Sequence, residues 1–248
     1  MFQKEFKSKL RADVNSVPPY LYGTIWKNLV QSSSLPPCST VGVFKFESEI
    51  QRDINRTFPQ LKFFRDPAGG QQELFNVLKA ISIQVPEVGY CQGMGFIAGI
   101  LLSHMSEQDA FRVFAVLITG ELGGLYKPGL PRLNEYLQEL GKMIETELPA
   151  LSAHFSFLGI DLSMFASQWI LSLFIYNLSF PKSLVLFNLF LIYGIKVILL
   201  FGLFVLSRMQ SQLLASGFEE CLSHINKGVD QTVPDMNAFM TDKSSFPS

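Results

Sequence analysis

Apolar residues recur at intervals of three and four along most of the chain, which is the spacing of one helical face. The clearest series runs over 74–85 and ends at Pro86. Another begins at Ser106, a candidate N-cap, and is broken by glycines from Gly120 onward. The alternation that predicts strands is scarce, and the one short stretch that fits it, 81–85, is outweighed by the longer helical phase. The pattern therefore predicts an all-α protein with no substantial β-sheet.

Two further segments extend this pattern. Apolar residues continue at helical spacing over 133–148 as far as Pro149, and an apolar run over 164–175 surrounds Trp169. The 248 residues, nearly half of them apolar, are enough to bury one substantial core. We therefore expect one domain rather than two small ones.

One stretch, 184–206, is almost wholly apolar and about as long as the ~20 residues that cross a bilayer. It contains Asn188 and Lys196, and a lysine near the middle of a span is costly unless it pairs or reaches the interface. Two buried helices that meet near Tyr193 and Gly194 explain the same residues. An integral membrane protein that spans through 184–206 is the less favoured alternative.

Composition narrows the functional class. The 20 Lys and Arg residues against 21 Asp and Glu residues give no global positive field, so nucleic acid is not a predicted partner. The three cysteines are far apart and form no C-x-x-C pair, which argues against a disulfide framework and a zinc site and favours a reducing cytosol. The histidines are equally scattered, and residues 1–10 contain no long apolar core of a secretory signal. We predict a cytoplasmic protein without a metal site.

The first segment with candidate chemistry is 50–56. Asp53 and Arg56 lie three residues apart on a predicted helix, so their side chains can touch. Ile50 and Ile54 are expected to face the core, and Pro59 turns the chain away after the helix. Taken alone, this segment is an exposed helix with an ion pair worth a few tenths of a kcal/mol.

The second segment is 88–99, in which a glycine-rich loop leads into an apolar helix. Gln92 stands at the exit of the loop, directly before Gly93. The glycines suit close packing between helices, but packing does not explain the polar amide of Gln92. That amide indicates contact with a group outside the chain.

Together the two segments resemble the signatures of the TBC domains that activate Rab GTPases, I-x-x-D-x-x-R and Y-x-Q-G. Both occur intact and in order, as Ile50, Asp53, Arg56 and then Tyr90, Gln92, Gly93. Flanking stretches are similar to the family's opening and middle: 17–19, 23–26, 148–155 and 165–169. The resemblance covers about 17–230 and implies a single multi-helix TBC (RabGAP) domain. Residues 1–16 are then an N-terminal extension and 231–248 a polar C-terminal tail.

The chain departs from the family pattern at a few places. Tyr22 stands where arginine is usual, and Phe187 and Asn188 replace a Trp-Asp pair. The connection over 27–49 is also shorter than is typical. Some packing and ion pairing must therefore differ, and the contacts of the first helices with a GTPase are in doubt.

The resemblance implies an activator that lends Arg56 and Gln92 in trans to a GTP-bound Rab, rather than an enzyme in the strict sense. Arg56 is expected to stabilise transition-state charge and Gln92 to position the attacking water. Asp53 is expected to hold the guanidinium, Tyr90 to shape the loop by packing, and Gly93 to let the backbone approach the partner. Ile50 anchors the helix that carries Arg56.

Other expectations follow from the same likeness. The chain needs no cofactor of its own, because GTP and Mg²⁺ belong to the GTPase. A role in membrane traffic is implied, with recruitment to endomembranes and peripheral membrane contact through the Rab. The main alternative is a catalytically silent adaptor that binds a Rab without accelerating hydrolysis.

Overall fold

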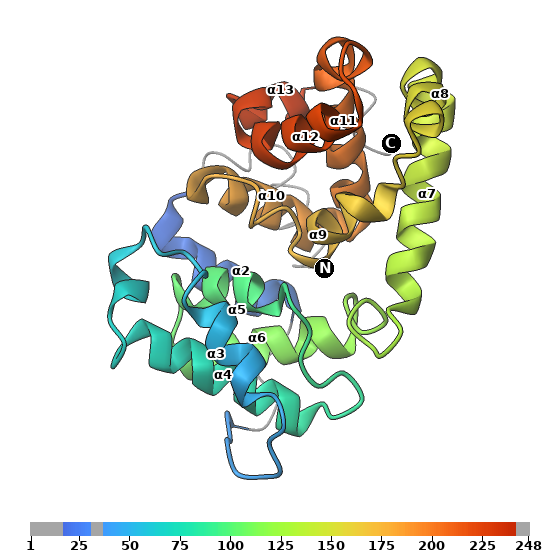
Figure 1. Ribbon diagram of the computed structural model, residues 1–248. Coiled ribbons are helices and arrows are strands. Elements are labelled where there is room, and N and C mark those ends of the chain that lie inside the picture. Colours follow the sequence, from blue (N-terminus) through green and yellow to red (C-terminus); the bar gives the residue numbers. More distant parts are fainter. Residues whose placement is uncertain (1–16, 31–36, 242–248) are drawn as a thin grey trace. The chain divides into compact units, whose positions relative to one another are not determined.

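The computed structural model describes residues 17–30 and 37–241. Within these ranges the regular structure is entirely helical and contains no strand, which confirms the predicted all-α class (Figure 1). The chain divides into two compact units, Met1–Pro131 and Arg132–Ser248. The predicted N-terminal extension and residues 242–248 of the predicted tail lie outside the described residues.

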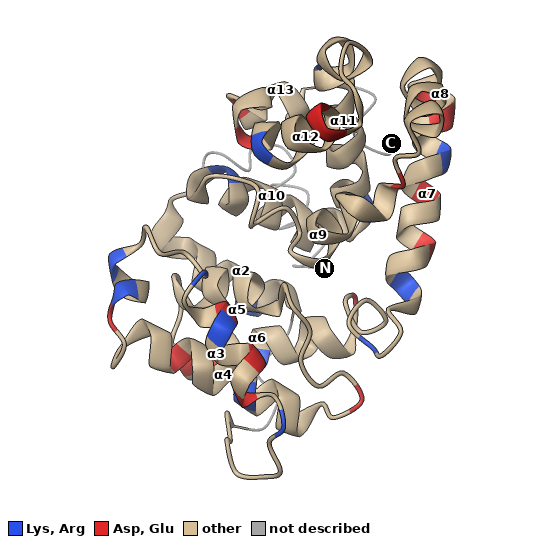
Figure 2. Ribbon diagram, viewed as in Figure 1, with Lys and Arg blue, Asp and Glu red and all other residues tan. Residues whose placement is uncertain are grey.

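Short 3-10 turns and α-helices make up the first unit: η2 Pro19–Leu21, α2 Tyr22–Val30, α3 Glu47–Ile54, η4 Lys62–Arg65, α4 Gly70–Gln84, α5 Met94–Leu102 and α6 Glu107–Thr119. The predicted apolar face of α4 is fully buried from Leu74 to Ile81, and α4 packs against α3, α5 and α6. The predicted cap of α6 is confirmed, since the Ser106 hydroxyl accepts a hydrogen bond from the Asp109 N–H. Charged residues are frequent on α3 and absent from α5 (Figure 2). The apolar helix α5 therefore forms the inner layer beside which α3 is placed.

Longer helices make up the second unit: α7 Pro131–Glu147, α8 Pro149–Leu158, η5 Leu162–Met164, α9 Ala166–Leu171, α10 Phe180–Tyr193, α11 Lys196–Leu214, α12 Phe218–Thr232 and α13 Met236–Met240. The long helix α11 packs against α8, α9, α10 and α12. The centre of this unit is therefore the apolar surface of α11.

The apolar stretch 184–206 is two helices and not one span. The chain breaks between α10 and α11 at Gly194, which has a φ of 75°, so the predicted meeting point is confirmed. Among the described residues one helix, α11, is long and apolar enough to cross a membrane, and buried core helices also meet that criterion. Because just over half of its apolar window is buried against other helices, we interpret α11 as a core helix.

The apolar run over 164–175 does not form one helix. After α9 the backbone reverses through Leu173 and Phe174, whose φ angles are 51° and 60°. The reversal is held because the Phe174 N–H donates to the Trp169 carbonyl at 2.7 Å. The Phe174 ring also stacks on the Trp169 ring, with centroids 4.8 Å apart. Burial of these two large rings offsets the strain of the left-handed backbone.

Ordered packing continues beyond residue 230, the predicted end of the domain. The helix α13 buries Phe239 completely, against the rings of Phe201 and Phe204 at 5.1 and 5.4 Å. Residues 231–241 are therefore part of the folded second unit rather than a polar tail. The predicted boundaries of the family domain itself stay a prediction.

The three residues that depart from the family pattern are buried. Tyr22 is buried and stacks on Trp26 with ring centroids 5.6 Å apart. Phe187 and Asn188 are both buried within α10. In the connection 27–49, α2 continues to Val30, and residues 37–46 form no regular element before α3 begins.

Candidate functional site

The helix α3 positions the first motif. Ile50 and Ile54 are 0% and 2% exposed, so they anchor the inner face of the helix as predicted. The helix ends at Ile54, and Arg56 follows in the turn after it. The Thr57 hydroxyl donates to the Asp53 carbonyl at 2.8 Å and closes this turn. Arg56 therefore emerges at the exit of a short helix that is held from within.

Asp53 connects the two motifs. Its Oδ1 lies 2.7 Å from Arg56 Nη2, which confirms the predicted contact, and its Oδ2 accepts a hydrogen bond of 2.5 Å from the Tyr90 hydroxyl. Burial, and then the hydrogen bond to Asp53, raise the pKa of Tyr90 far above its ordinary value. Tyr90 thus stays protonated and remains a donor at any physiological pH. The sequence predicted that Tyr90 would act by packing, and its hydroxyl contact was missed because the two residues are 37 positions apart.

The segment of the second motif requires glycine at two places, one in the loop and one within α5. Gly93 has a φ of 110°, a backbone conformation that side chains disfavour, and it directly precedes α5. A Cβ on Gly99 would lie 2.9 Å from Thr57 Cγ2 and 3.0 Å from the Phe58 ring. The bare backbone of α5 therefore lets the turn after α3 approach closely. This contact places the two motif segments side by side.

Both motifs contribute to a single pocket of about 390 Å³ in the first unit. The lining residues are Glu49, Arg52, Asp53, Arg56, Tyr90 and Gln92. The Gln92 residue is exposed, and the Arg56 side chain is 36% exposed. The structure thus brings the two predicted catalytic side chains to one open surface.

Two residues of this pocket were missed by the sequence analysis. Glu49 and Arg52 lie four residues before Asp53 and Arg56, and residues at that spacing share one face of a helix. That spacing was the signal that could have found them. The predicted supporting residue Gly93 is buried. Its visible contribution is the backbone turn that it makes before α5.

Electrostatically, the pocket contains two acidic and two basic side chains, so their formal charges cancel. The ion pair is asymmetric, because the Asp53 side chain is only 13% exposed while that of Arg56 is 36% exposed. The Arg56 Nε atom is buried and finds no hydrogen-bond partner among the described residues.

No group of three or more His, Cys, Asp or Glu side chains suited to a metal occurs in the part of the chain that the structure describes. The arrangement can therefore present a fixed guanidinium and a carboxamide to an oxygen-rich ligand.

Comparison with known proteins identifies the class to which this fold and pocket belong. The sequence model of the Rab-GTPase-TBC domain matches residues 16–214. The chain is 34% identical over 237 residues to the human ecotropic viral integration site 5 protein homolog, covering 88% of this chain and 28% of that protein. It is 38% identical over 185 residues to the Rab GTPase-activating protein eat-17 of Caenorhabditis elegans, covering 74% of this chain and 21% of that protein. The chain thus spans about a quarter of the length of these relatives.

Solved structures share the fold. The TBC domain of a Chlamydomonas flagellar RabGAP superposes with a TM-score of 0.80 at 24% identity, covering 98% of this chain and 86% of that one. The Ypt/Rab-GAP domain of Gyp1p gives a TM-score of 0.73 at 15% identity, with coverage of 96% and 92%. The match of the family model over residues 16–214 shows that the protein belongs to the Rab-GTPase-TBC domain family.

Proposed function

We propose that this chain accelerates GTP hydrolysis by a Rab-family GTPase, with Arg56 and Gln92 as the two side chains that enter the reaction. The family relationship supports the class of activity. The observation that carries the residue assignment is the shared pocket, in which both side chains stand on one open surface beside a fixed aspartate. The activity belongs to the partner GTPase, so this chain contributes groups and no cofactor.

Arg56 would stabilise the negative charge of the transition state. Transfer of the γ-phosphoryl group to water passes through a loose transition state with negative charge on the phosphoryl oxygens and on the leaving oxygen. A planar guanidinium can donate to two of these oxygens and remains charged in a dry site. Asp53 pairs with Nη2 of Arg56 and the Nε atom is buried, so contact with the ligand would run through the part of the guanidinium that stays exposed. An arginine supplied in trans contributes about 10³ to 10⁵ in rate.

Gln92 would act on the attacking water. Its amide has both an acceptor oxygen and donor hydrogens, so it can hold a water in line with the phosphoryl group. The residue projects directly before the rigid start of α5, which fixes the backbone from which the amide reaches out. Tyr90 and Asp53 position the arginine, and Gly93 gives the loop its turn.

The experiment is phosphate release from a panel of GTP-loaded Rab proteins, with the wild-type chain and with Arg56→Ala and Gln92→Ala. We expect a loss of about 10³-fold for the arginine variant and a comparable order of loss for the glutamine variant, since both act on one step. Arg65→Ala is the matched control, because Arg65 is an exposed arginine of the same unit that does not line the pocket.

The adaptor alternative makes a different prediction for the same panel. A wild-type chain that binds a GTP-loaded Rab but accelerates none of them would be an adaptor. Acceleration that survives both Arg56→Ala and Gln92→Ala would instead show that other groups carry the reaction. In either case binding, measured separately, distinguishes loss of chemistry from loss of contact.

A further inference from the structure

Arg52 lies in the same pocket as Arg56 but outside the positions that define the first motif. It lies on α3 four residues before Arg56, which follows the end of the helix, and both arginines line the pocket. The residue is exposed, and its Nε donates to the Ser48 carbonyl of its own helix at 3.1 Å. This bond uses the Nε atom, and the two terminal nitrogens make no hydrogen bond to another described residue.

The charges around Arg52 differ from those around Arg56. Arg56 is paired with Asp53 at 2.7 Å, whereas no ion pair within 4.0 Å joins Arg52 to any described residue. Glu49 is the remaining acid in the pocket, and its carboxylate accepts a hydrogen bond from the Ser48 hydroxyl at 2.8 Å. The charge of Arg52 also acts on Glu49, but the two side chains form no ion pair within 4.0 Å. Arg52 is therefore the pocket cation whose charge is not used by a close ion pair among the described residues.

We propose that Arg52 binds an oxyanion of the GTP-loaded GTPase and contributes to its affinity, while Arg56 contributes to the rate of hydrolysis. The inference rests on the proposed function for the identity of the partner. An exposed guanidinium with two free terminal nitrogens suits a carboxylate or a phosphate, because its planar fork donates two parallel hydrogen bonds. Arg52 is thus a binding residue, and its contribution falls on affinity and KM rather than on kcat.

Loss of Arg52 would also change the charge of the pocket. With Arg52 present the four charged side chains cancel, and without it the pocket is net negative and repels an anionic ligand. Glu49 provides the reciprocal case, because its removal leaves the pocket net positive. The two substitutions are therefore expected to change association in opposite directions.

The test measures binding and hydrolysis separately, with the panel Rab protein that binds the wild-type chain most tightly. Affinity is measured for that GTPase loaded with a non-hydrolysable GTP analogue, at low and at high salt. We expect Arg52→Ala to weaken binding and raise KM roughly threefold to tenfold, with kcat nearly unchanged and a shallower dependence on salt. Glu49→Gln is expected to strengthen binding by a similar or smaller factor.

Arg65→Ala is the matched control, since Arg65 is also exposed, also uses its Nε on a backbone carbonyl, and does not line the pocket. The same affinities measured with the GDP-loaded GTPase identify the source of the oxyanion. A loss confined to the GTP-analogue form indicates the γ-phosphate, and an equal loss in both forms indicates a carboxylate of the GTPase. Arg52→Lys, which keeps the charge without the fork, should recover part of the affinity.

Unchanged affinity and KM in Arg52→Ala would overturn the inference, as would a fall in kcat with unchanged KM. These results are separate from failure of the proposed function, in which no GTPase of the panel is accelerated by the wild-type chain. If binding occurs without acceleration, Arg52→Ala still tests the inference through affinity alone. Far-UV circular dichroism of the variant checks that α3 is intact.

Discussion

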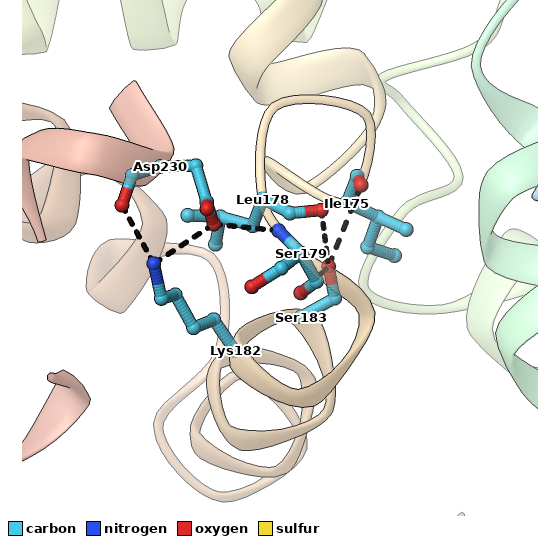
Figure 3. A network of polar contacts seen from close by, with 6 residues as sticks. All are labelled: Ile175, Leu178, Ser179, Lys182, Ser183 and Asp230. Atoms are coloured by element: carbon cyan, nitrogen blue, oxygen red, sulfur yellow. Dashed lines mark hydrogen bonds and ion pairs between the residues drawn. The ribbon is translucent and has the colours of Figure 1, made fainter. Parts of the chain in front are cut away.

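Two aspartates in this protein make similar contacts but differ in which of their partners is exposed. In the first unit Asp53 binds Arg56 and the Tyr90 hydroxyl. In the second unit Asp230 binds Lys182 Nζ at 3.0 Å and accepts a 2.6 Å hydrogen bond from the Ser179 N–H (Figure 3). Each carboxylate therefore joins one cation and one neutral donor. Arg56 and Tyr90 come from different segments, whereas Lys182 and Ser179 both lie at the start of α10.

The difference lies in which partner faces the solvent. Around Asp53 the cation is the more exposed side chain, 36% against 13%, whereas around Asp230 the cation is the more buried, 18% against 38%. Lys182 Nζ also donates to the Asp230 carbonyl at 2.6 Å, so its donors are used within the fold. In the first network the more exposed partner is the cation, so its charge can be presented to a ligand. In the second network the less exposed partner is the cation, and the contact ties the start of α10 to α12 and contributes to stability.

The largest effect that separates the two networks is expected from exchanging the cations. Arg56→Lys keeps the charge but loses the planar fork, so we expect kcat for stimulated hydrolysis to fall by about 100-fold. Lys182→Arg is the matched exchange in the second unit and should leave kcat unchanged. Single-turnover phosphate release measures both variants. Full activity in Arg56→Lys would mean that charge alone suffices at this position.

A smaller effect is expected from the neutral donor of the first network. Tyr90→Phe leaves Asp53 Oδ2 without its hydrogen bond, so the carboxylate and the guanidinium that it holds lose their fixed position. We expect kcat to fall roughly tenfold while Arg56 remains present, with little change in KM. The comparison of kcat with KM in the hydrolysis assay is the measurement.

Phe46→Leu is the control for Tyr90→Phe. It trims the ring that faces Tyr90, at 6.5 Å between centroids, and leaves the hydroxyl bond intact. If the two substitutions lower kcat equally, packing around Tyr90 matters more than its contact with Asp53.

Local features of the site and fold could be predicted from the sequence, because one helical turn fixes them. The contact of Asp53 with Arg56 follows from a spacing of three residues, and the Ser106 cap follows from the residue type before an apolar run. The same logic at a spacing of four would have found Arg52 beside Arg56. These features depend on the helix alone and not on what packs against it.

Features that depend on tertiary packing could not be predicted in this way. The bond from Tyr90 to Asp53 exists because α5 approaches the turn after α3 closely, and α4 packs against both of these helices. The reversal at Leu173 and Phe174 contains no glycine from which it could be predicted. Ring packing rather than local preference sustains the positive φ angles. Burial of α13 likewise depends on rings contributed by α11.

In the second network we expect a moderate effect on stability and none on the activity. Asp230→Asn removes the ion pair with Lys182 and weakens the bond from the Ser179 N–H, which should cost about 1 kcal/mol of the free energy of unfolding. The urea midpoint of unfolding measures this loss, and phosphate release should match that of the wild type. A large loss of activity would contradict the distinction between the two networks.

The same substitution predicts a pH dependence. Burial opposes ionisation of Asp230, but hydrogen bonds from Ser179 and Lys182 outweigh it and hold the pKa below its ordinary value of 3.8. A carboxyl group whose pKa is depressed by folding stabilises the protein above the unfolded pKa, and this stabilisation is lost as the pH falls through the folded pKa. The difference in stability between the wild type and Asp230→Asn should therefore be constant from pH 5 upward and shrink below about pH 4.

The smallest effect is expected from removing the cation while keeping its stem. Lys182→Met preserves the apolar part of the side chain, and Asp230 retains its bond from the Ser179 N–H, so we expect a loss of about 0.5 kcal/mol. Combined with Asp230→Asn, it forms a double-mutant cycle. The double variant should lose less stability than the sum of the two single losses, because both substitutions remove the same ion pair. Strict additivity would show that Lys182 stabilises the unit through the Asp230 carbonyl rather than through the carboxylate. Asp230 would then hold its cation through the backbone carbonyl, whereas Asp53 holds Arg56 through its carboxylate.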